Sequence, residues 1–336
     1  MPLRYQNHSM NRFQKLCVHF FCFFGIFFLI HAVSAISVSP VVVTHDLEPG
    51  GVVSDVISIK NTNDRSERYV ISTQNFIAEG EDGRQLFLDQ QASFGLAEWI
   101  ATDESEVTLA PNEVREIRYQ IQVPQNATPG GQYAAVFFSV VPLQGQSGSV
   151  GVQGKVGVLF LVRVSGDVVE KVSVESFGVT SHSPQSRLPV IFETRVRNDG
   201  NVHLEPEGVI RIRNIFGAVT REILVNQSSA FVLPGSVRRF EAEWKRPGSM
   251  DAGAGFLYEL KREWEQFAFG RYTAEVDATV GKTRQPLHAV TTFWIFPWRL
   301  VLVGAAVLIF AIVCVRIYAR MTIHAALRKR RSPKRK

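Results

Sequence analysis

Cysteine is nearly absent from this sequence, and its three occurrences all lie towards the ends of the chain. Cys17 and Cys22 fall in an apolar N-terminal stretch, and Cys314 falls in a second apolar run near the C-terminus. Residues 36–292 contain none, which excludes disulfides, cysteine-ligated zinc and a catalytic thiol from that region. Its domains must therefore be held together by burial of apolar side chains, which segments of this length allow.

The central region also lacks an excess of positive charge, although the whole chain carries a net charge of +6. Residues 1–35 hold three basic residues and no acidic one, and residues 316–336 hold nine basic residues and again no acid. Residues 36–298 hold 24 Lys and Arg against all 31 Asp and Glu, a net charge of −7. Because such a body repels phosphate groups at long range, we predict no nucleic-acid partner.

Sequence patterns typical of catalysis are missing as well. The histidines of the central region are isolated from one another, at His45, His182, His203 and His288. Neither a His-Glu-x-x-His pair nor a Gly-x-Ser-x-Gly elbow occurs. We therefore predict that the protein is not an enzyme, with no catalytic residues, no metal site, no cofactor and no small-molecule substrate.

One acidic group invites a comparison with calcium sites. Glu79, Glu81 and Asp82 lie beside Gly80 and Gly83, but their spacing is not that of an EF-hand loop. We expect a solvated hairpin tip at this position.

The N-terminus carries the features of an export signal. Basic residues precede an apolar, Phe-rich run over residues 16–30, and the small residues that a signal peptidase reads follow it. We predict a signal peptide over residues 1–35, cleaved between Ala35 and Ile36. An uncleaved anchor is the alternative, although the run is short for a membrane span. Met10 is an alternative start.

A second apolar segment predicts a transmembrane helix over residues 293–315. At ~1.5 Å per residue it extends about 34 Å, enough to cross a hydrocarbon core of ~30 Å. Arg299 is its only charged residue and lies beside Trp294 and Trp298, so we predict that these three side chains anchor the helix at the membrane interface. The basic tail, residues 316–336, is predicted to be cytoplasmic. The topology is then single-pass type I in the cell membrane, with the body outside.

Strand patterns dominate the region between the two apolar ends. Residues 116–123, 190–196 and 272–280 alternate apolar and polar side chains, whereas residues 134–141 and 156–164 are nearly continuous apolar runs suited to inner strands. Turn-forming sequences separate most of these stretches, and helical periodicity is scarce. We predict an all-β fold with two tandem immunoglobulin-like β-sandwich domains, plus one C-terminal transmembrane helix.

The order of several short motifs indicates an internal repeat. A predicted strand ends at Asn61 and is followed by Pro111, and Asn198 and Pro234 take the same order in the second half. Val and Arg follow each proline at the third and fourth positions. We therefore predict two domains of similar design, over residues 36–165 and 166–292.

One segment departs from the strand pattern, a predicted helical insertion near residues 250–268. Phe256, Leu260, Trp264 and Phe267 recur at helical spacing, with charged residues between them. We expect a short amphipathic helix that docks its apolar face onto the second sandwich as a lid. The alternatives are a surface for a partner protein and a contact with the outer leaflet of the membrane.

Several turn and strand motifs carry a resemblance to a known family. In the first half they are Ser39-Pro40, Pro49-Gly50, Asn61-Thr62-Asn63, Leu109-Ala110-Pro111 and Pro129-Gly130-Gly131-Gln132-Tyr133. On these motifs, residues 36–142 resemble the peptidoglycan-binding domain of WxL-interacting proteins. Asn198-Asp199-Gly200-Asn201, with Pro206 and Gly208, is similar to the second domain of such proteins. The resemblance implies an exported, membrane-anchored binding protein of a bacterial cell surface.

Two functions follow as hypotheses. The first is a membrane-anchored, extracytoplasmic binding or scaffold protein whose partner is the cell envelope glycan, peptidoglycan, or another surface protein. The alternative is a chaperone-like assembly factor for surface proteins, in which an exposed sheet edge accepts a strand from a client. A permanent membrane anchor favours the first.

Overall fold

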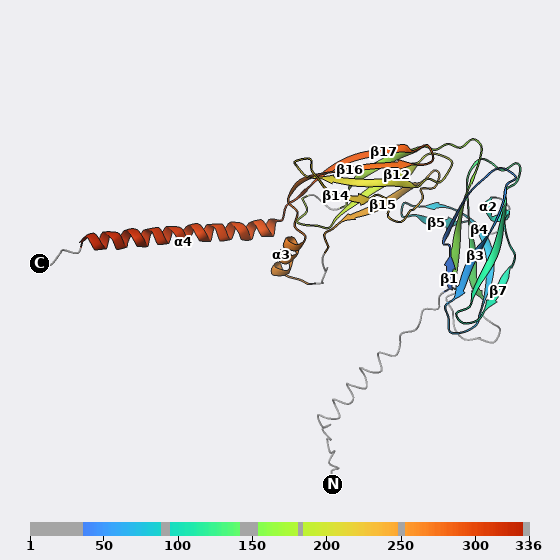
Figure 1. Cartoon of the computed structure of the whole chain (residues 1–336), viewed down its shortest axis with the longest axis horizontal. Helices are drawn as coiled ribbons and strands as arrows, with labels where there is room; N and C mark the ends of the chain where they lie inside the picture. The colour runs from blue at the N-terminus through green and yellow to red at the C-terminus, as the bar shows by residue number, and fades with distance from the viewer. Residues whose placement is uncertain (1–35, 89–94, 142–153, 181–183, 248–252, 332–336) are drawn as a thin grey trace, which may run out of the picture.

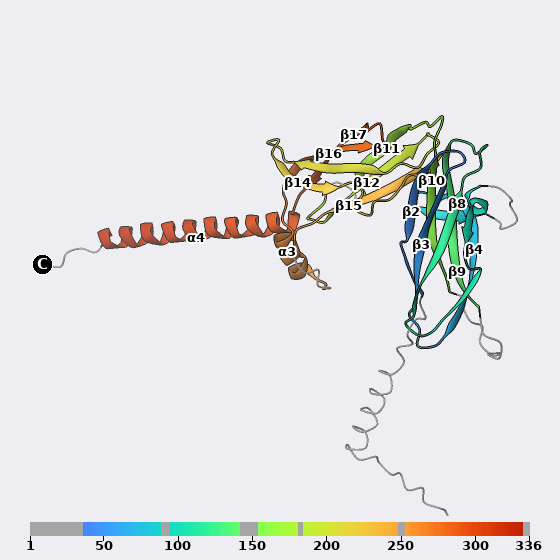
Figure 2. The same cartoon turned by 45° about the vertical axis from the view of Figure 1, so that its right-hand side comes forward.

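The computed structural model describes residues 36–88, 95–141, 154–180, 184–247 and 253–331. Two β-sheet bodies lie across each other in an L shape, and a long helix leaves the far end of the second body (Figures 1 and 2). The predicted signal peptide, with Ala35, lies outside the described residues, as does the end of the basic tail from residue 332 onwards. Ile36, the first residue after the predicted cleavage point, begins the first strand.

The first body consists of strands from the N-terminal half and one short helix: β1 (Ile36–Ser39), β2 (Val42–Leu47), β3 (Val52–Asn61), β4 (Glu67–Glu79), β5 (Arg84–Phe87), α2 (Leu96–Trp99), β6 (Ile100–Thr102), β7 (Glu106–Leu109), β8 (Val114–Gln122), β9 (Gly130–Val141) and β10 (Lys155–Val164). One sheet has the order β1-β3-β8-β6 and the other the order β2-β10-β9-β4-β5, with β7 also paired to β4. All pairs are antiparallel except β2 with β10.

The second body follows from strands of the C-terminal half: β11 (Val172–Val179), β12 (Val190–Asn198), β13 (Pro206–Arg213), β14 (Val219–Leu224), β15 (Val237–Trp244), α3 (Phe256–Glu265), β16 (Gly270–Val280) and β17 (Gln285–Ile295). Its sheets have the orders β11-β12-β15 and β14-β13-β16-β17. The helix α4 (Trp298–Arg331) completes the described chain. The predicted fold class, two tandem immunoglobulin-like sandwiches with one C-terminal helix, is confirmed.

Each sandwich is held by apolar residues on alternate positions of its facing strands. In the first, Ile117, Tyr119 and Ile121 of β8 are buried against Phe160 and Val162 of β10, as the period-two pattern predicts. The rings of Tyr119 and Phe160 meet edge to face at 4.9 Å. In the second, a cluster of large aromatic side chains fills the core: Phe192, Trp244, Tyr272 and Phe293.

The predicted internal repeat has a structural basis in two buried asparagines. Asn61 ends β3 and Asn198 ends β12, and both side chains are fully buried. In each half the side-chain amide donates to the carbonyl oxygen two residues before the following proline, at 3.1 Å from Asn61 and 2.9 Å from Asn198. In each half the asparagine N–H also donates to the carbonyl two residues after that proline, at 3.0 Å. The asparagine thus joins a strand end to a distant loop in both sandwiches.

The predicted start of the C-terminal helix, at residue 293, was wrong. Strand β17 runs to Ile295, and Phe293 is buried in the second core, so the first residues of the predicted span belong to the sandwich. The end of β17 and the start of the helix form one apolar run in the sequence, so the pattern does not show that the strand ends and the helix begins on either side of Pro297. Within the described residues, Trp298–His324 is the one stretch long and apolar enough to cross a membrane. Its 27 residues extend about 40 Å.

Candidate functional site: the cleft between the sandwiches

The two sandwiches contact each other through an apolar cluster that is separate from their two cores. Phe76 of β4, Phe137 of β9 and Leu161 of β10 are buried on the outer face of one sheet of the first sandwich. Phe231 and Leu233, from the loop between β14 and β15, pack against them. A sheet with apolar residues on both faces explains the nearly continuous apolar runs of β9 and β10 in the sequence.

The β4–β5 hairpin reaches across to the second sandwich and pairs with it by charge. Glu81 accepts two hydrogen bonds from the guanidinium of Arg195, one of them from Nε at 2.7 Å, and Asp82 pairs with Arg239. The Arg239 N–H donates to the Glu81 carbonyl at 2.8 Å. The hydrogen bonds from Arg195 lower the pKa of Glu81. The expectation of a solvated tip is corrected: these acids are inter-domain contacts.

A partly buried histidine lies at the same interface. His203 packs edge to face between Tyr133 of the first sandwich, at 5.7 Å between centroids, and Phe231, at 5.2 Å. Burial lowers its pKa to about 4, so the ring is neutral at pH 7. Beside it, the Gly131 N–H donates to the Asn201 carbonyl at 2.7 Å.

Acidic and basic side chains hold the connection between the two bodies. Glu170 accepts hydrogen bonds from Arg163 at 2.7 Å and from the Thr283 hydroxyl at 2.8 Å. Burial alone would raise the pKa of Glu170, but the hydrogen bonds outweigh that effect and hold it at about 2. Lys282 pairs with Asp46 across the interface at 2.8 Å.

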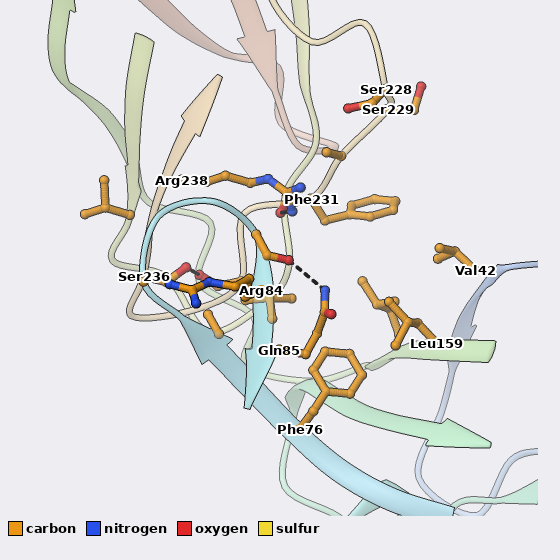
Figure 3. Close-up of a pocket in the computed structure, with 17 residues that line it drawn as sticks. Val42, Phe76, Arg84, Gln85, Leu159, Ser228, Ser229, Phe231, Ser236 and Arg238 are labelled. Carbon is orange, nitrogen blue, oxygen red and sulfur yellow. Dashed lines mark hydrogen bonds between the residues drawn. The ribbon is translucent and has the colours of Figure 1, made fainter. Parts of the chain in front are cut away.

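The apolar cluster leaves a cavity of about 240 Å³ between the bodies, shown in Figure 3. Its walls come from β2, β4, β5 and β10 of the first sandwich and from the 228–238 segment of the second. Apolar side chains make up much of the lining: Val42, Phe76, Leu159, Leu161, Phe231 and Leu233. The volume suits one or two side chains of a partner rather than a large cofactor.

Arg238 supplies a cation to this cavity. Its Nη1 donates to the Phe231 carbonyl at 2.7 Å. Among the described residues, no carboxylate pairs with its guanidinium, and desolvation is the one cause that shifts its pKa. Desolvation lowers the pKa of Arg238, although an arginine remains charged. A partly buried cation with N–H groups left over has the chemistry of an anion-binding group.

The β4–β5 hairpin and a serine pair, Ser228 and Ser229, complete the rim. Arg84 and Gln85 begin β5 and line the cavity, and the Gln85 amide donates to the Gly83 carbonyl at 2.8 Å (Figure 3). Gly83 has a φ of +76°, which favours glycine, and a Cβ there would lie 2.3 Å from an Arg238 nitrogen and so displace the guanidinium from its present position. The cleft can therefore accept an apolar group that carries a carboxylate or a similar anion.

The residues predicted as a partner surface lie at the opposite end of the second sandwich. Phe256, Leu260 and Trp264 are on α3, whereas Phe267 follows the end of that helix. The expected lid was wrong, because Trp264 is 72% exposed. The helix docks instead through its polar side, with Glu263 fully buried.

The predicted interfacial anchors lie at the base of α4. Trp294 is on β17, and Trp298 and Arg299 begin the helix. The Arg299 guanidinium lies 4.5 Å from the Trp298 ring, and its Nη1 donates to Glu263 at 2.9 Å. The arginine therefore has a carboxylate partner within the protein, and its position in a membrane interface stays a prediction.

Sequence reasoning missed Arg238 and the Glu81–Arg195 contact. Arg238 does follow Pro234 at the repeat offset, but its equivalent, Arg115, pairs with Glu113 at 2.8 Å in the first sandwich. The two arginines differ in the residues that surround them, and the repeat pattern in the sequence does not predict those neighbours. Within the described residues, no group of three or more His, Cys, Asp or Glu has the geometry to hold a metal ion.

No family model and no curated protein matches the chain. Among solved structures, it is similar to a chaperone–tip adhesin complex of CFA/I fimbriae (10% identity, TM-score 0.38, 77% of this chain and 99% of that one). It is also similar to the class 5 fimbriae chaperone CfaA (11%, 0.36, 77% and 99%) and to the E. coli chaperone DraB (10%, 0.34, 78% and 96%). Likeness at this level assigns no function to the chain.

Proposed function

We propose that the protein is a membrane-anchored, extracytoplasmic binding protein that holds a polypeptide partner in the cleft between its sandwiches. The partner contributes an extended segment with an apolar side chain and a carboxylate, of which a chain terminus is the simplest example. This function takes up the assembly-factor alternative and places the client contact between the domains. Peptidoglycan as a partner stays a prediction from the family resemblance alone.

The observation that carries the proposal is the charge of Arg238 beside apolar walls. The guanidinium, which has no carboxylate partner among the described residues, is partly desolvated by Phe231 and its neighbours, so a bound anion would compensate the guanidinium for its lost solvation. The apolar lining would at the same time bury a side chain next to that anion. The net charge of −7 on the body gives no general attraction for anions, so the affinity must come from this local group.

The anchor in this proposal is α4. Its apolar stretch is long enough to cross a bilayer. Apart from Arg299 in its first turn, the Lys and Arg residues of this part of the chain all follow the apolar stretch, from Arg316 onwards. Positive charge next to a span favours the cytoplasmic side. Both sandwiches then lie outside the membrane, and the cleft opens to extracytoplasmic proteins.

A peptide assay tests the cleft. The probe is a fluorescent nine-residue peptide of alternating Val and Thr that ends in Phe with a free carboxylate, titrated with the full-length protein in detergent and followed by anisotropy. The proposal predicts binding of this peptide and at least about ten-fold weaker binding of its C-terminal amide, because a charge-assisted hydrogen bond contributes about 1.5–3 kcal/mol.

A cavity-filling variant locates the binding. Ala78 lines the cavity from β4, so Ala78→Phe should block both peptides, whereas Ala101→Phe, at an exposed position on β6, should leave binding unchanged. Equal affinity for the acid and the amide in the unaltered protein contradicts the proposal.

A further inference from the structure

The short helix α3 has its apolar and polar sides in the opposite arrangement from a helix docked on a core. Glu259, Glu263 and Gln266, at helical spacing, face the protein, and Glu263 and Gln266 are buried. Leu257 is 78% exposed and Trp264 is 72% exposed on the other side. A soluble surface helix normally places these two kinds of residue the other way round.

Polar contacts tie α3 firmly to the base of α4. Glu263 accepts hydrogen bonds from Arg299 Nη1 at 2.9 Å and from the Leu300 N–H at 3.1 Å, which caps the first turn of α4. Glu259 pairs with Arg187 of the sandwich at 2.6 Å and lies 3.8 Å from Arg299. The depth of α3 is therefore fixed relative to the start of the apolar span.

The orientation of α3 suits a surface perpendicular to α4. In Figures 1 and 2, α3 lies beside the first turn of α4 and runs across the direction of that long helix. A bilayer crossed by α4 would have its outer surface in this plane.

Other exposed apolar residues gather at the same end of the second sandwich. The β13–β14 turn lies beside the start of β16, which pairs with the end of β17. This turn carries Phe216, which is 85% exposed. The remaining members of this end are also exposed: Ile215, Phe269, Phe296 and Trp298. Aromatic side chains of this kind concentrate at membrane–water interfaces.

We propose that α3 and the 214–217 turn form a membrane-contact surface that enters the outer-leaflet headgroup region through Leu257, Trp264 and Phe216. The occupant is the lipid surface, because α4 begins among these residues and holds α3 at the depth where its span starts. The contact fixes the tilt of the sandwiches above the bilayer and so the direction in which the cleft faces. The proposal rests on the span proposed for α4.

Spin-label accessibility tests this surface. The three native cysteines are replaced by Ser, single nitroxide labels are placed at Leu257→Cys and Trp264→Cys in the full chain, and the protein is reconstituted in phosphatidylcholine vesicles. We expect both labels to be several-fold more accessible to oxygen than to a water-soluble nickel complex. A label at Ser228→Cys, exposed at the other end of the sandwich, should show the reverse.

A label at Ile309→Cys, in the middle of α4, separates the two proposals. If Ile309 is in lipid while Leu257 and Trp264 match Ser228, the membrane-contact surface is wrong and the span stands. If Ile309 is also aqueous, the span itself fails. Protection of Leu257 and Trp264 from both reagents shows a protein partner or a second copy on α3 and overturns the lipid assignment.

A second measurement avoids the labelled variants. Tryptophan emission of the unlabelled protein in vesicles of brominated phosphatidylcholine is compared with that of Trp264→Phe. The proposal predicts that the fluorescence lost in Trp264→Phe is the strongly quenched part. An unquenched Trp264 contribution contradicts it.

Discussion

At the scale of single residues, the two sandwiches depend on one buried asparagine each. Asn198 donates to the Val202 carbonyl at 2.7 Å and to the Val232 carbonyl at 2.9 Å, and its side-chain oxygen accepts the Gly200 N–H at 2.9 Å. Asn61 makes the corresponding contacts in the first sandwich. The sequence order of Asn and Pro predicted the repeat. The hydrogen bonds that each asparagine makes could not be predicted, because they depend on the conformation of the loop that follows it.

Asn198→Ala is expected to destabilise the second sandwich by about 3 kcal/mol, because it leaves buried carbonyl and N–H groups without partners. Chemical denaturation of the full chain in detergent measures the loss. Asn126→Ala, in an exposed turn, is the control and should change stability by less than about 0.5 kcal/mol. An equal effect of the two changes would refute the role of Asn198.

His203 makes the domain interface sensitive to acid. Its pKa is about 4 in the folded protein, against 6.5 when exposed, so above pH 6.5 the ring is neutral in both states. As the pH falls from 6.5 to 4, only the unfolded chain takes up the proton, and stability falls by up to about 3 kcal/mol.

His203→Phe keeps a ring between Tyr133 and Phe231 and should remove most of this loss, measured as unfolding free energy at pH 7, 5.5 and 4.5. A smaller slope remains from His45, whose pKa burial also lowers. An unchanged slope in His203→Phe would count against this assignment.

At the scale of elements, the β4–β5 hairpin joins the two bodies. Glu81→Gln together with Asp82→Asn removes its charged contacts with Arg195 and Arg239, so the angle between the sandwiches should vary more widely. Spin labels at Ser54→Cys and Thr220→Cys, one on each sandwich, report this as a broader distance distribution.

The neighbouring Glu79→Gln is the matched control for the hairpin, because its side chain is exposed and outside the contact with Arg195. The exchange of charges in Glu81→Arg with Arg195→Glu should narrow the distribution again. If the hairpin variant and the control give the same distribution, the hairpin does not restrain the domains.

Periodicity predicted most strands correctly because each has one face in a core. It placed the start of the C-terminal helix at Phe293 because apolar character alone does not separate a buried strand from a span. It also predicted that Trp264 is docked, since an amphipathic pattern gives the apolar side but not what covers it. The spacing of Glu259, Glu263 and Gln266, opposite Arg299 in the structure, becomes informative only after folding brings α4 beside α3.

At the scale of the whole molecule, the two ends of the body have separate roles in this account. The end of the second sandwich next to α4 carries exposed apolar residues and adjoins the proposed span. The first sandwich meets the other end of the second one (Figure 1), and the cleft lies between the two. The cleft could not be predicted from sequence, because its walls come from segments more than 60 residues apart, such as Leu159 and Phe231. The docking of the sandwiches brings Arg238 to these walls, where no carboxylate of the described residues pairs with it.

The most direct test of the account is the dependence of peptide binding on Arg238. The affinities of the free-acid and amide peptides are measured for the unaltered protein, for Arg238→Gln and for Arg221→Gln, which changes an exposed arginine on the same sandwich. The account predicts that the preference for the acid, about ten-fold or more, disappears in Arg238→Gln and persists in Arg221→Gln. A preference that survives in Arg238→Gln would contradict the cleft as the binding site.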